Sequence, residues 1–457
     1  MDVARRNSII FAVAPFCVAA AFWWMHPYLA IDADTPRYLA NDPMRTATYP
    51  LFLDLTYGPA LLPLQLFLFA GALAWLAIYA ARFLPLALTA ALVLTIGANP
   101  YLWELQATIM SEALTTPLLT LIVGCIVGFA ATRKPALLVF AALFCGIAAS
   151  IRPPCIALIA APIAAALLAP GLKGRGGMLA LVVVACAAPV VVERVYSRMI
   201  HGENLASPIG RHAFMKAAVI DAPETTIASN DPLDQRLVRA LNQDFRPVRR
   251  LLHEAPSWQV RYTLLTNYEA CAAWGCGDLI LKGVNRPRPD IDSALLHVGM
   301  ARLKTNPIGY LELSATEYHR MWLLHPRKHP GLAPLYNNFL ARHSPLPFQL
   351  QLGIEGKPTP AAEQKSSLRF NRAAFAGVGI VAALMTAVAG LLWRRSPSQA
   401  ALPLLLGSQA VLVLSAFTAV GLPRYAMGMW PMIIAGIFMG GLGLLDARLE
   451  ARSRRER

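Results

Sequence analysis

The sequence predicts an all-α polytopic membrane protein with about ten transmembrane helices and a mainly helical domain outside the membrane. Three observations support this fold class. The 457 residues are 56% hydrophobic and only 15% charged, which is more apolar surface than one soluble core can bury. The apolar residues form runs long enough to cross a bilayer. A polar stretch at residues 196–372 separates these runs and is long enough for a domain of its own.

Ten apolar runs are candidate transmembrane helices, because about 17–25 apolar residues suffice to cross a bilayer. They lie at residues 8–27, 60–81, 84–102, 113–131, 135–151, 155–170, 177–193, 373–393, 400–420 and 426–445. The first run also has features of a cleaved signal peptide, but it continues through Phe22-Trp23-Trp24 to a spanning length. We therefore expect a transmembrane module at 1–195 with an external loop at 28–59, an external domain at 196–372, and C-terminal helices with a basic tail at 373–457.

The basic residues predict the orientation of the chain. With the N-terminus inside, the cytoplasmic side holds Arg5, Arg6, Arg82, Arg133, Lys134, Lys173, Arg175, Arg394, Arg395, Arg448, Arg452, Arg454, Arg455 and Arg457. This bias follows the positive-inside rule, so we expect both termini in the cytoplasm and the polar stretch from Ile31 to Pro50 outside. These bases account for most of the net charge of +15. The charge therefore does not call for nucleic acid, and membrane lipids are the expected partners of the tail.

Polar residues gather at the predicted outer ends of the spans. The loop after the first span reads IDADTPRYLANDPMRTATYP and carries acids and arginines where the chain meets water. Tyr49 to Pro59 is apolar but interrupted, which predicts a short helix along the interface. Ser111 or its neighbours can cap a helix that carries Glu112 in its first turn, where the helix dipole favours a carboxylate.

Several other chemistries are poorly matched. The sequence contains no Walker loop, no dinucleotide fingerprint and no serine elbow. The histidines around HRMWLLHPRKH lack the helical spacing of a zinc site, so we expect neither a metal nor a cofactor. Lys216 is expected on a solvated face. Cys271 and Cys276 lie in the external domain, where an oxidising compartment permits a disulfide between them.

The order of the motifs resembles the GT-C superfamily of membrane glycosyltransferases. The matching segments are DADTPRYL after the first span, RTATYPLFL, an NP turn followed by SEALTTPLLTL, GIAASIRPP, and a late LPRYAMGMWP. They are most similar to the bacterial branch that includes the lipid A aminoarabinose transferase and the protein O-mannosyltransferases. The resemblance covers the membrane half of the chain well, whereas residues 196–372 match only in being external and helical.

The resemblance implies an inverting hexosyl- or pentosyltransferase. It would move a sugar from a polyprenyl-phosphate donor to a lipid, glycan or protein acceptor. Such a reaction needs a carboxylate that accepts the acceptor's proton and arginines that hold the departing phosphate.

Asp34 matches the acidic residue of the family, and Asp32 is its nearest rival. Two residues apart in an extended segment, the pair faces one side, where mutual repulsion would raise one pKa. Glu112 is the third candidate acid. The candidates for binding the phosphate and the substrate are Arg45, Tyr49, Arg152, Arg424 and Tyr425.

Two alternatives remain open at this point. A polymerase or ligase of lipid-linked glycans would also use external arginines. A transporter should show polar or broken helices near the middle of the bilayer and two similar halves, but the polar residues here gather at the span ends and the halves are dissimilar.

Overall fold

The computed structural model describes most of the chain as helices joined by turns. The residues that it does not describe are 1–2, 28, 31–33, 57, 59, 203–207, 256, 258–260, 262–263, 266–267, 270–271, 273–275, 323–376, 396, 420–422 and 456–457. In the described part the chain forms no sheet, and its one recorded strand-like pairing is an isolated bridge between Ala30 and Thr108.

The chain divides into two compact units. Unit 1 comprises Met1–Ile200, Glu363–Leu412 and Arg424–Arg457, and unit 2 comprises His201–Ala362 and Val413–Pro423. Unit 2 thus covers most of the segment that the sequence predicts to be a separate domain.

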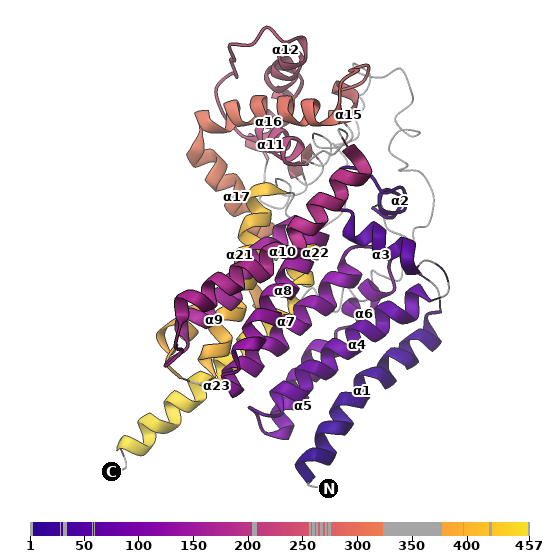
Figure 1. The fold of residues 1–457 in the computed structure, drawn as a ribbon. Helices are drawn as coiled ribbons and strands as arrows, with labels where there is room; N and C mark the ends of the chain where they lie inside the picture. The colour runs from indigo at the N-terminus through magenta and orange to yellow at the C-terminus, as the bar shows by residue number, and fades with distance from the viewer. Residues whose placement is uncertain are drawn as a thin grey trace. The chain divides into compact units, whose positions relative to one another are not determined.

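Unit 1 contains the apolar helices (Figure 1). They and the short helices between them are α1 (Val3–Met25), α2 (Thr35–Leu39), α3 (Thr48–Thr56), α4 (Leu61–Ala80), α5 (Leu86–Gly97), α6 (Pro100–Gln106), α7 (Glu112–Thr132), α8 (Pro135–Ile151), η1 (Pro153–Ile159), α9 (Ala160–Leu168), α10 (Arg175–His201), Gly377–Leu391, α21 (Ser398–Thr418, whose last turn belongs to unit 2), α22 (Pro423–Gly428) and α23 (Trp430–Arg455). The helix α7 is central, since it packs against α4, α8 and α23.

Five of the described helices, α4, α7, α10, α21 and α23, are long and apolar enough to cross a membrane. The pair α5 and α6 makes a sixth if the two helices count as one span. The four remaining expected spans fall on shorter apolar helices, namely Val13–Met25 within α1, Pro135–Ile151, Pro153–Leu168 and Gly377–Leu391. The chain is therefore a membrane protein, whereas the number of ten spans stays a prediction.

The expected span at 84–102 differs from the structure. It is broken at Ala98–Asn99, and α5 and α6 meet at an angle of 57°. The cause is Pro100, because proline disfavours helical geometry in the residue before it. Asn99 is accordingly extended, and its side chain accepts a hydrogen bond from the Tyr101 amide that caps α6.

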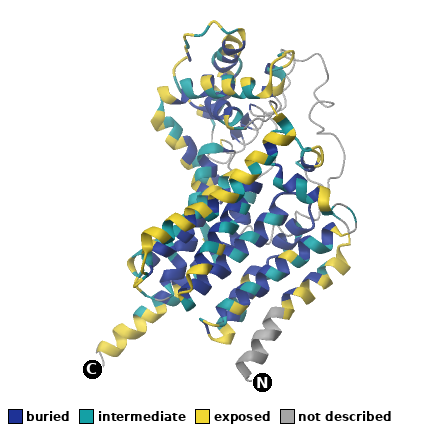
Figure 2. Ribbon diagram, in the orientation of Figure 1, coloured by how far each residue is buried: buried dark blue, intermediate teal, exposed yellow. Residues whose placement is uncertain are grey.

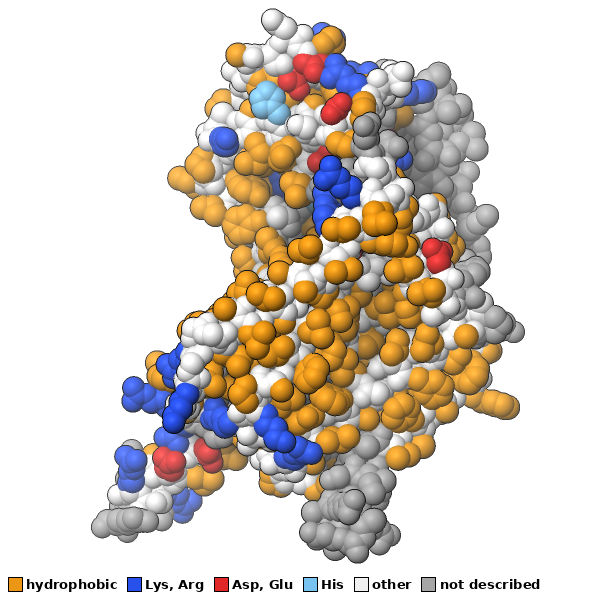
Figure 3. All heavy atoms as spheres, viewed as in Figure 1, with side chains coloured by type: hydrophobic (Ala, Val, Ile, Leu, Met, Phe, Trp, Pro, Cys, Tyr) orange, Lys and Arg blue, Asp and Glu red, His pale blue; other side chains and the backbone are white. Residues whose placement is uncertain are grey.

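The helix α10 displays apolar side chains on its surface. Val184, Val192 and Met199 are 63%, 68% and 79% exposed, and Figures 2 and 3 show this exposed, hydrophobic face turned to the viewer. An apolar surface of this extent on a 27-residue helix is costly in water and favourable in lipid.

Close packing between helices requires glycine at two positions. A Cβ added to Gly146 of α8 would lie 2.2 Å from the carbonyl oxygen of Cys186 in α10, and one added to Gly124 of α7 would lie 2.5 Å from the Trp75 ring. Small residues at such crossings are typical of helices packed within a bilayer.

Unit 2 has its own hydrophobic core, which includes Phe214, Leu237, Phe245 and Val298. Its helices are α11 (Ile209–Val219), α12 (Pro232–Arg239), the π-helical turn η3 (Ala240–Asp244), α13 (Arg246–His253), α15 (Cys276–Ile280), α16 (Arg288–Thr305) and α17 (Pro307–Met321).

Two sequence-based predictions concern unit 2. The expectation of a solvated Lys216 is wrong, because its side chain is 1% exposed and its Nζ lies 3.2 Å from Glu269 Oε1. The Glu269 carboxylate also pairs with the buried Arg320, so these charges are compensated inside the core. Cys276 is disulfide-bonded, as predicted, while its expected partner Cys271 lies outside the described residues.

Candidate active site

Five charged side chains from distant parts of unit 1 meet at one end of its helices. Asp34 immediately precedes α2, Arg45 lies in the loop before α3, and Glu112 is the first residue of α7. Arg152 separates α8 from η1, and Arg424 lies in α22. The sequence predicted all five as site residues, and the structure brings them together.

Asp34 is held between two arginines. Its Oδ1 atom lies 2.5 Å from an Arg45 nitrogen, and its Oδ2 atom lies 3.0 Å from an Arg424 nitrogen. All three side chains keep between 21% and 27% of their surface exposed. This ion-paired group is therefore within reach of a ligand.

Glu112 is almost fully buried, at 3% exposure, and its Oε1 atom lies 2.7 Å from an Arg152 nitrogen. Its other oxygen accepts a hydrogen bond from the Ser111 hydroxyl at 3.0 Å. Ser111 was expected to cap α7, but no side-chain cap bond forms, because its hydroxyl serves the carboxylate instead.

Arg424 links the two acids. Besides its contact with Asp34, its Nε atom lies 3.8 Å from Glu112 Oε1. The Tyr425 ring lies beside the guanidinium groups of Arg152 and Arg424, at 4.9 and 5.9 Å from its centroid. Rings and guanidinium groups at these distances attract one another, which fixes where the two cations lie.

Main-chain contacts hold the segment that carries Asp34. The Ala30 amide donates to the Ala107 carbonyl, and the Ile109 amide donates to the Ala30 carbonyl. The Thr35 hydroxyl donates to the Ile109 carbonyl at 2.8 Å. These bonds tie the loop to the chain just before α7 and so place Asp34 near Glu112.

A second set of contacts holds the loop that carries Arg45. The Thr46 hydroxyl donates to the Ile151 carbonyl at the end of α8. The Ala47 amide donates to a carboxylate oxygen of Glu193 in α10 at 3.1 Å, and the Ser197 hydroxyl donates to the same oxygen. The loop is therefore fixed to two apolar helices directly after Arg45.

Two tyrosines pack next to the ion pairs. The ring of Tyr38 lies 5.3 Å from the Arg45 guanidinium, and its hydroxyl donates to Ser111. Tyr49 is fully buried, packs edge-on against Tyr38 at 5.0 Å, and accepts a hydrogen bond from Gln65. Tyr49, predicted to bind substrate, thus positions Tyr38 instead of lining the site.

Sequence patterns did not identify Tyr38 as a residue of the site, nor the hydrogen bond of Ser111 to Glu112. Burial, together with the nearby Glu112 charge, raises the pKa of Tyr38, so its hydroxyl stays protonated and can keep donating to Ser111. The only signal in the sequence was the position of Tyr38 in DADTPRYL, four residues after Asp34.

The expected rise in the pKa of an aspartate is wrong for Asp34. Burial acts to raise the pKa, but the charges of Arg424 and Arg45 outweigh it and hold the pKa below the ordinary value. Asp34 is therefore ionised at neutral pH. Asp32, the rival candidate, lies outside the described residues.

The charges of the group do not balance. Among the described residues, Arg45, Arg152 and Arg424 face Asp34 and Glu112, and the charge of Arg37 also acts on Asp34. Positive charge is therefore in excess. Arginine has a planar fork of donors that matches a phosphate or carboxylate. The arrangement is consequently suited to an anion.

Comparisons with known proteins add little to this geometry. No protein-family model matches the chain, and no curated protein matches it. Among solved structures, it matches the crystal structure of ArnT from Cupriavidus metallidurans bound to undecaprenyl phosphate, with 15% identity over 94% of this chain and 77% of that one. The TM-score of 0.34 is too low to carry the assignment, which rests on the site itself.

Proposed function

We propose that this chain is an inverting glycosyltransferase that takes a sugar from a polyprenyl-phosphate donor. The observation that carries the proposal is the convergence of Arg45, Arg152 and Arg424 on two carboxylates at one end of a bundle of apolar helices. A lipid-linked donor needs both features at once, an apolar surface for its tail and cations for its phosphate.

The excess positive charge suits the donor. A sugar phosphodiester carries one negative charge, which the surplus arginine charge attracts. When the bond between the anomeric carbon and the phosphate oxygen breaks, its electron pair stays on the phosphate, which then carries a second charge. Preorganised arginines stabilise this developing charge more than the initial one, and that difference accelerates the reaction.

Asp34 is the proposed general base. In the structure both of its oxygens are paired with arginine, which makes it a weak base. A donor phosphate that takes over Arg424 or Arg45 removes one of these contacts and raises the pKa of the carboxylate. Asp34 then accepts the proton of the acceptor hydroxyl while that oxygen attacks the anomeric carbon from the side opposite the phosphate.

Glu112 and Arg152 have a supporting part in this proposal. Their ion pair is the more buried one, and both side chains are fixed by Ser111 and Tyr425. We assign to Glu112 the positioning of Arg152, in preference to a role as base. Arg152 remains, with 18% of its side chain exposed, a cation that a phosphate can contact.

We place the site and the domain at 196–372 on the periplasmic side of a bacterial inner membrane, with both termini in the cytoplasm. The distribution of basic residues supports this orientation. Asp34, Glu112, Arg152 and Arg424 all lie at ends of apolar helices that an alternating topology brings to one side. The acceptor is proposed to be a hydroxyl of a lipid, glycan or protein.

The proposal is tested by purifying the chain in lipid nanodiscs and supplying a polyprenyl-phosphate sugar with a candidate acceptor. Release of polyprenyl phosphate together with a product of inverted anomeric configuration is the expected result. The acceptor class is found first, by comparing envelope glycolipids and glycans from a deletion strain and its parent by mass spectrometry.

The same assay separates the alternatives. A polymerase or ligase would transfer a glycan and release polyprenyl diphosphate when the donor carries that group. A transporter would move the lipid-linked sugar across the bilayer without forming a new glycosidic bond. The proposal is contradicted if either result is obtained and the Asp34→Asn variant gives the same result as the wild type.

A further inference from the structure

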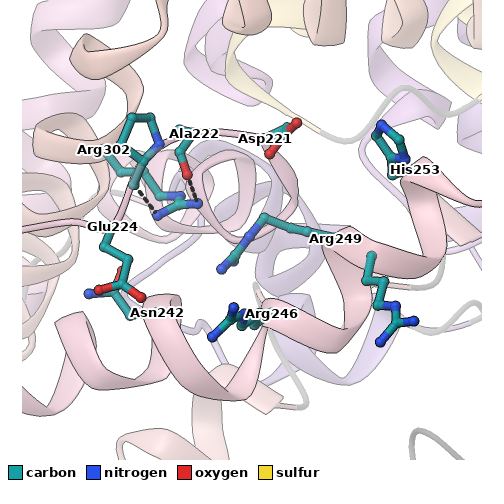
Figure 4. A pocket seen from close by; sticks show the side chains of 10 residues that line it. Asp221, Ala222, Glu224, Asn242, Arg246, Arg249, His253 and Arg302 are labelled. Atoms are coloured by element: carbon teal, nitrogen blue, oxygen red, sulfur yellow. Dashed lines mark hydrogen bonds between the residues drawn. The ribbon is translucent and has the colours of Figure 1, made fainter.

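Unit 2 contains a cavity of about 410 Å³ whose wall is rich in arginine (Figure 4). Arg246, Arg249 and Arg250 come from α13, and Arg302 comes from α16. Nothing in the proposed glycosyl transfer uses these residues. They belong to a different unit from the five charged residues of the candidate active site.

Arg302 is a buried cation without a carboxylate partner. Its side chain is 1% exposed. One of its terminal nitrogens donates to the Pro223 carbonyl and the Thr225 hydroxyl, and the other donates to the Ala222 carbonyl. Within the described residues it forms no ion pair. These neutral acceptors take hydrogen bonds from its terminal nitrogens but do not pair with its charge, and a charge buried without a close counter-ion is costly inside a protein.

Arg249 adds a second cation at the same place. It is partly buried, and one of its nitrogens donates to the Ala218 carbonyl at 3.2 Å. Burial and the charge of Arg302 lower the pKa of Arg249 to about 10. The two guanidinium groups therefore repel each other. Figure 4 shows Arg246 and Arg249 extending in the same direction from α13.

The acids of the cavity offset these charges only in part, because Asp221 and Glu224 act on Arg249 and Arg302 from a distance. Asp221 and Glu224 lie on the segment after α11, and both are exposed. In the described part of the chain neither comes within ion-pair distance of the arginines. Arg250 differs, since Glu254 pairs with it at 2.8 Å. The remaining three arginines from two helices outnumber the two carboxylates, which favours an anion over a metal ion.

We propose that this cavity binds a phosphate group. Several guanidinium groups directed at one space match an anion that has several oxygens and up to two charges. The group arrives either as soluble phosphate or as the phosphate of a lipid headgroup. The relevant contacts come from Arg246 and Arg249, while Arg302, whose terminal nitrogens are already engaged, adds its charge from the cavity wall. This binding is independent of glycosyl transfer at Asp34.

The test uses the full-length protein purified in detergent, with two probes. Inorganic phosphate represents the soluble source, and dihexanoylphosphatidic acid represents the headgroup. Dihexanoylphosphatidylcholine, whose headgroup has no net charge, is the control lipid. Binding is measured by isothermal titration calorimetry for the wild type, Arg249→Ala and Arg246→Ala. The matched control is Arg239→Ala, which removes an exposed arginine of α12 outside the cavity.

We expect Arg249→Ala and Arg246→Ala to weaken binding of at least one probe roughly tenfold or more, because each removes a charge-assisted contact. Arg239→Ala should stay within about twofold of the wild type. The arginines around Asp34 also attract phosphate, so the component that counts is the one lost in the cavity variants and retained in the control. Thermal melting of each variant verifies that it is folded, and the exposed Arg246 provides a variant with little structural risk.

The two probes distinguish the sources. Tighter binding of dihexanoylphosphatidic acid assigns the cavity to a lipid headgroup, and tighter binding of inorganic phosphate assigns it to a soluble anion. The proposal is overturned if neither probe binds. It is equally overturned if the cavity variants bind as the wild type does, or if Arg239→Ala loses as much affinity as they do.

Discussion

The ion pair of Glu112 with Arg152 should contribute mainly to stability. Arg152→Gln leaves Glu112, which is 3% exposed, with a main-chain hydrogen bond, the Ser111 hydroxyl and an Arg424 nitrogen at 3.8 Å. Removal of one partner from a buried ion pair costs about 3–5 kcal/mol. Because these weaker contacts remain, we expect a loss near the lower end, about 3 kcal/mol.

Arg424→Gln is the matched comparison, since each acid keeps its shorter contact. Asp34 retains Arg45 at 2.5 Å, and Glu112 retains Arg152 at 2.7 Å. Arg424 is also 27% exposed, so the lost pair should cost only about 1 kcal/mol. Its loss should nevertheless reduce donor use strongly, because a charge-assisted contact to phosphate is worth roughly 1.5–3 kcal/mol.

The assay is denaturant or thermal unfolding of the purified variants in detergent, together with the double variant Glu112→Gln, Arg152→Gln. In the double variant neither member of the buried pair is charged. It should therefore lose less stability than Glu112→Gln and Arg152→Gln lose when they are measured separately and added. If Arg152→Gln and Arg424→Gln destabilise the protein equally, the distinction between a structural Glu112–Arg152 pair and a substrate-binding Arg424 is refuted. Strict additivity in the double variant would refute the buried pair itself.

Three further outcomes are expected. Asp34→Asn should lower transfer by about 10²–10⁴ without preventing insertion, with Asp32→Asn as the control; near-normal transfer by Asp34→Asn excludes it as the base. Because arginine charges hold the pKa of Asp34 below its ordinary value, its pairing stabilises the fold above about pH 4. That contribution is lost as the pH falls through the lowered pKa, so unfolding experiments should show a larger acid-induced loss for the wild type than for Asp34→Asn. Gly146→Val should destabilise the fold by about 1–3 kcal/mol, measured by melting, whereas an unchanged melting temperature contradicts the close approach to Cys186.

The location of the candidate site could be predicted from the sequence because it depends mainly on the order of the apolar spans. Spans that alternate in direction, as the sequence predicts, place Asp34, Glu112, Arg152 and Arg424 at one end of the helices, where the structure brings their side chains together. The pairing of Asp34 with Arg424, 390 residues apart, has no such local signature. Its geometry depends on how the helices pack, which span positions do not specify.

Burial was the property that sequence patterns specified least. Lys216 lies in a helix with polar and apolar residues, which is typical of a solvated face, yet its buried partner Glu269 lies 53 positions away. Tyr49 was associated with the substrate because it follows Arg45, but its ring belongs to a core cluster with Tyr38 and Leu53. In contrast, the break at Asn99 had a local cause in Pro100 that the sequence already displayed.

The hydrogen bond between Ala47 and Glu193 connects the candidate site to the thickness of the bilayer. On α10, the exposed side chains are apolar in the turns that end at Val192, whereas beyond Glu193 the exposed Arg194 and Arg198 alternate with the exposed Val195 and Met199. This change from an apolar to a mixed surface is typical of the depth at which a helix leaves the hydrocarbon. Glu193 also holds the loop of Arg45. We therefore expect a bilayer whose thickness does not match the apolar length of α10 to displace the loop that positions the guanidinium. Hydrophobic matching to the surrounding lipid thus becomes one of the determinants of the geometry at Asp34.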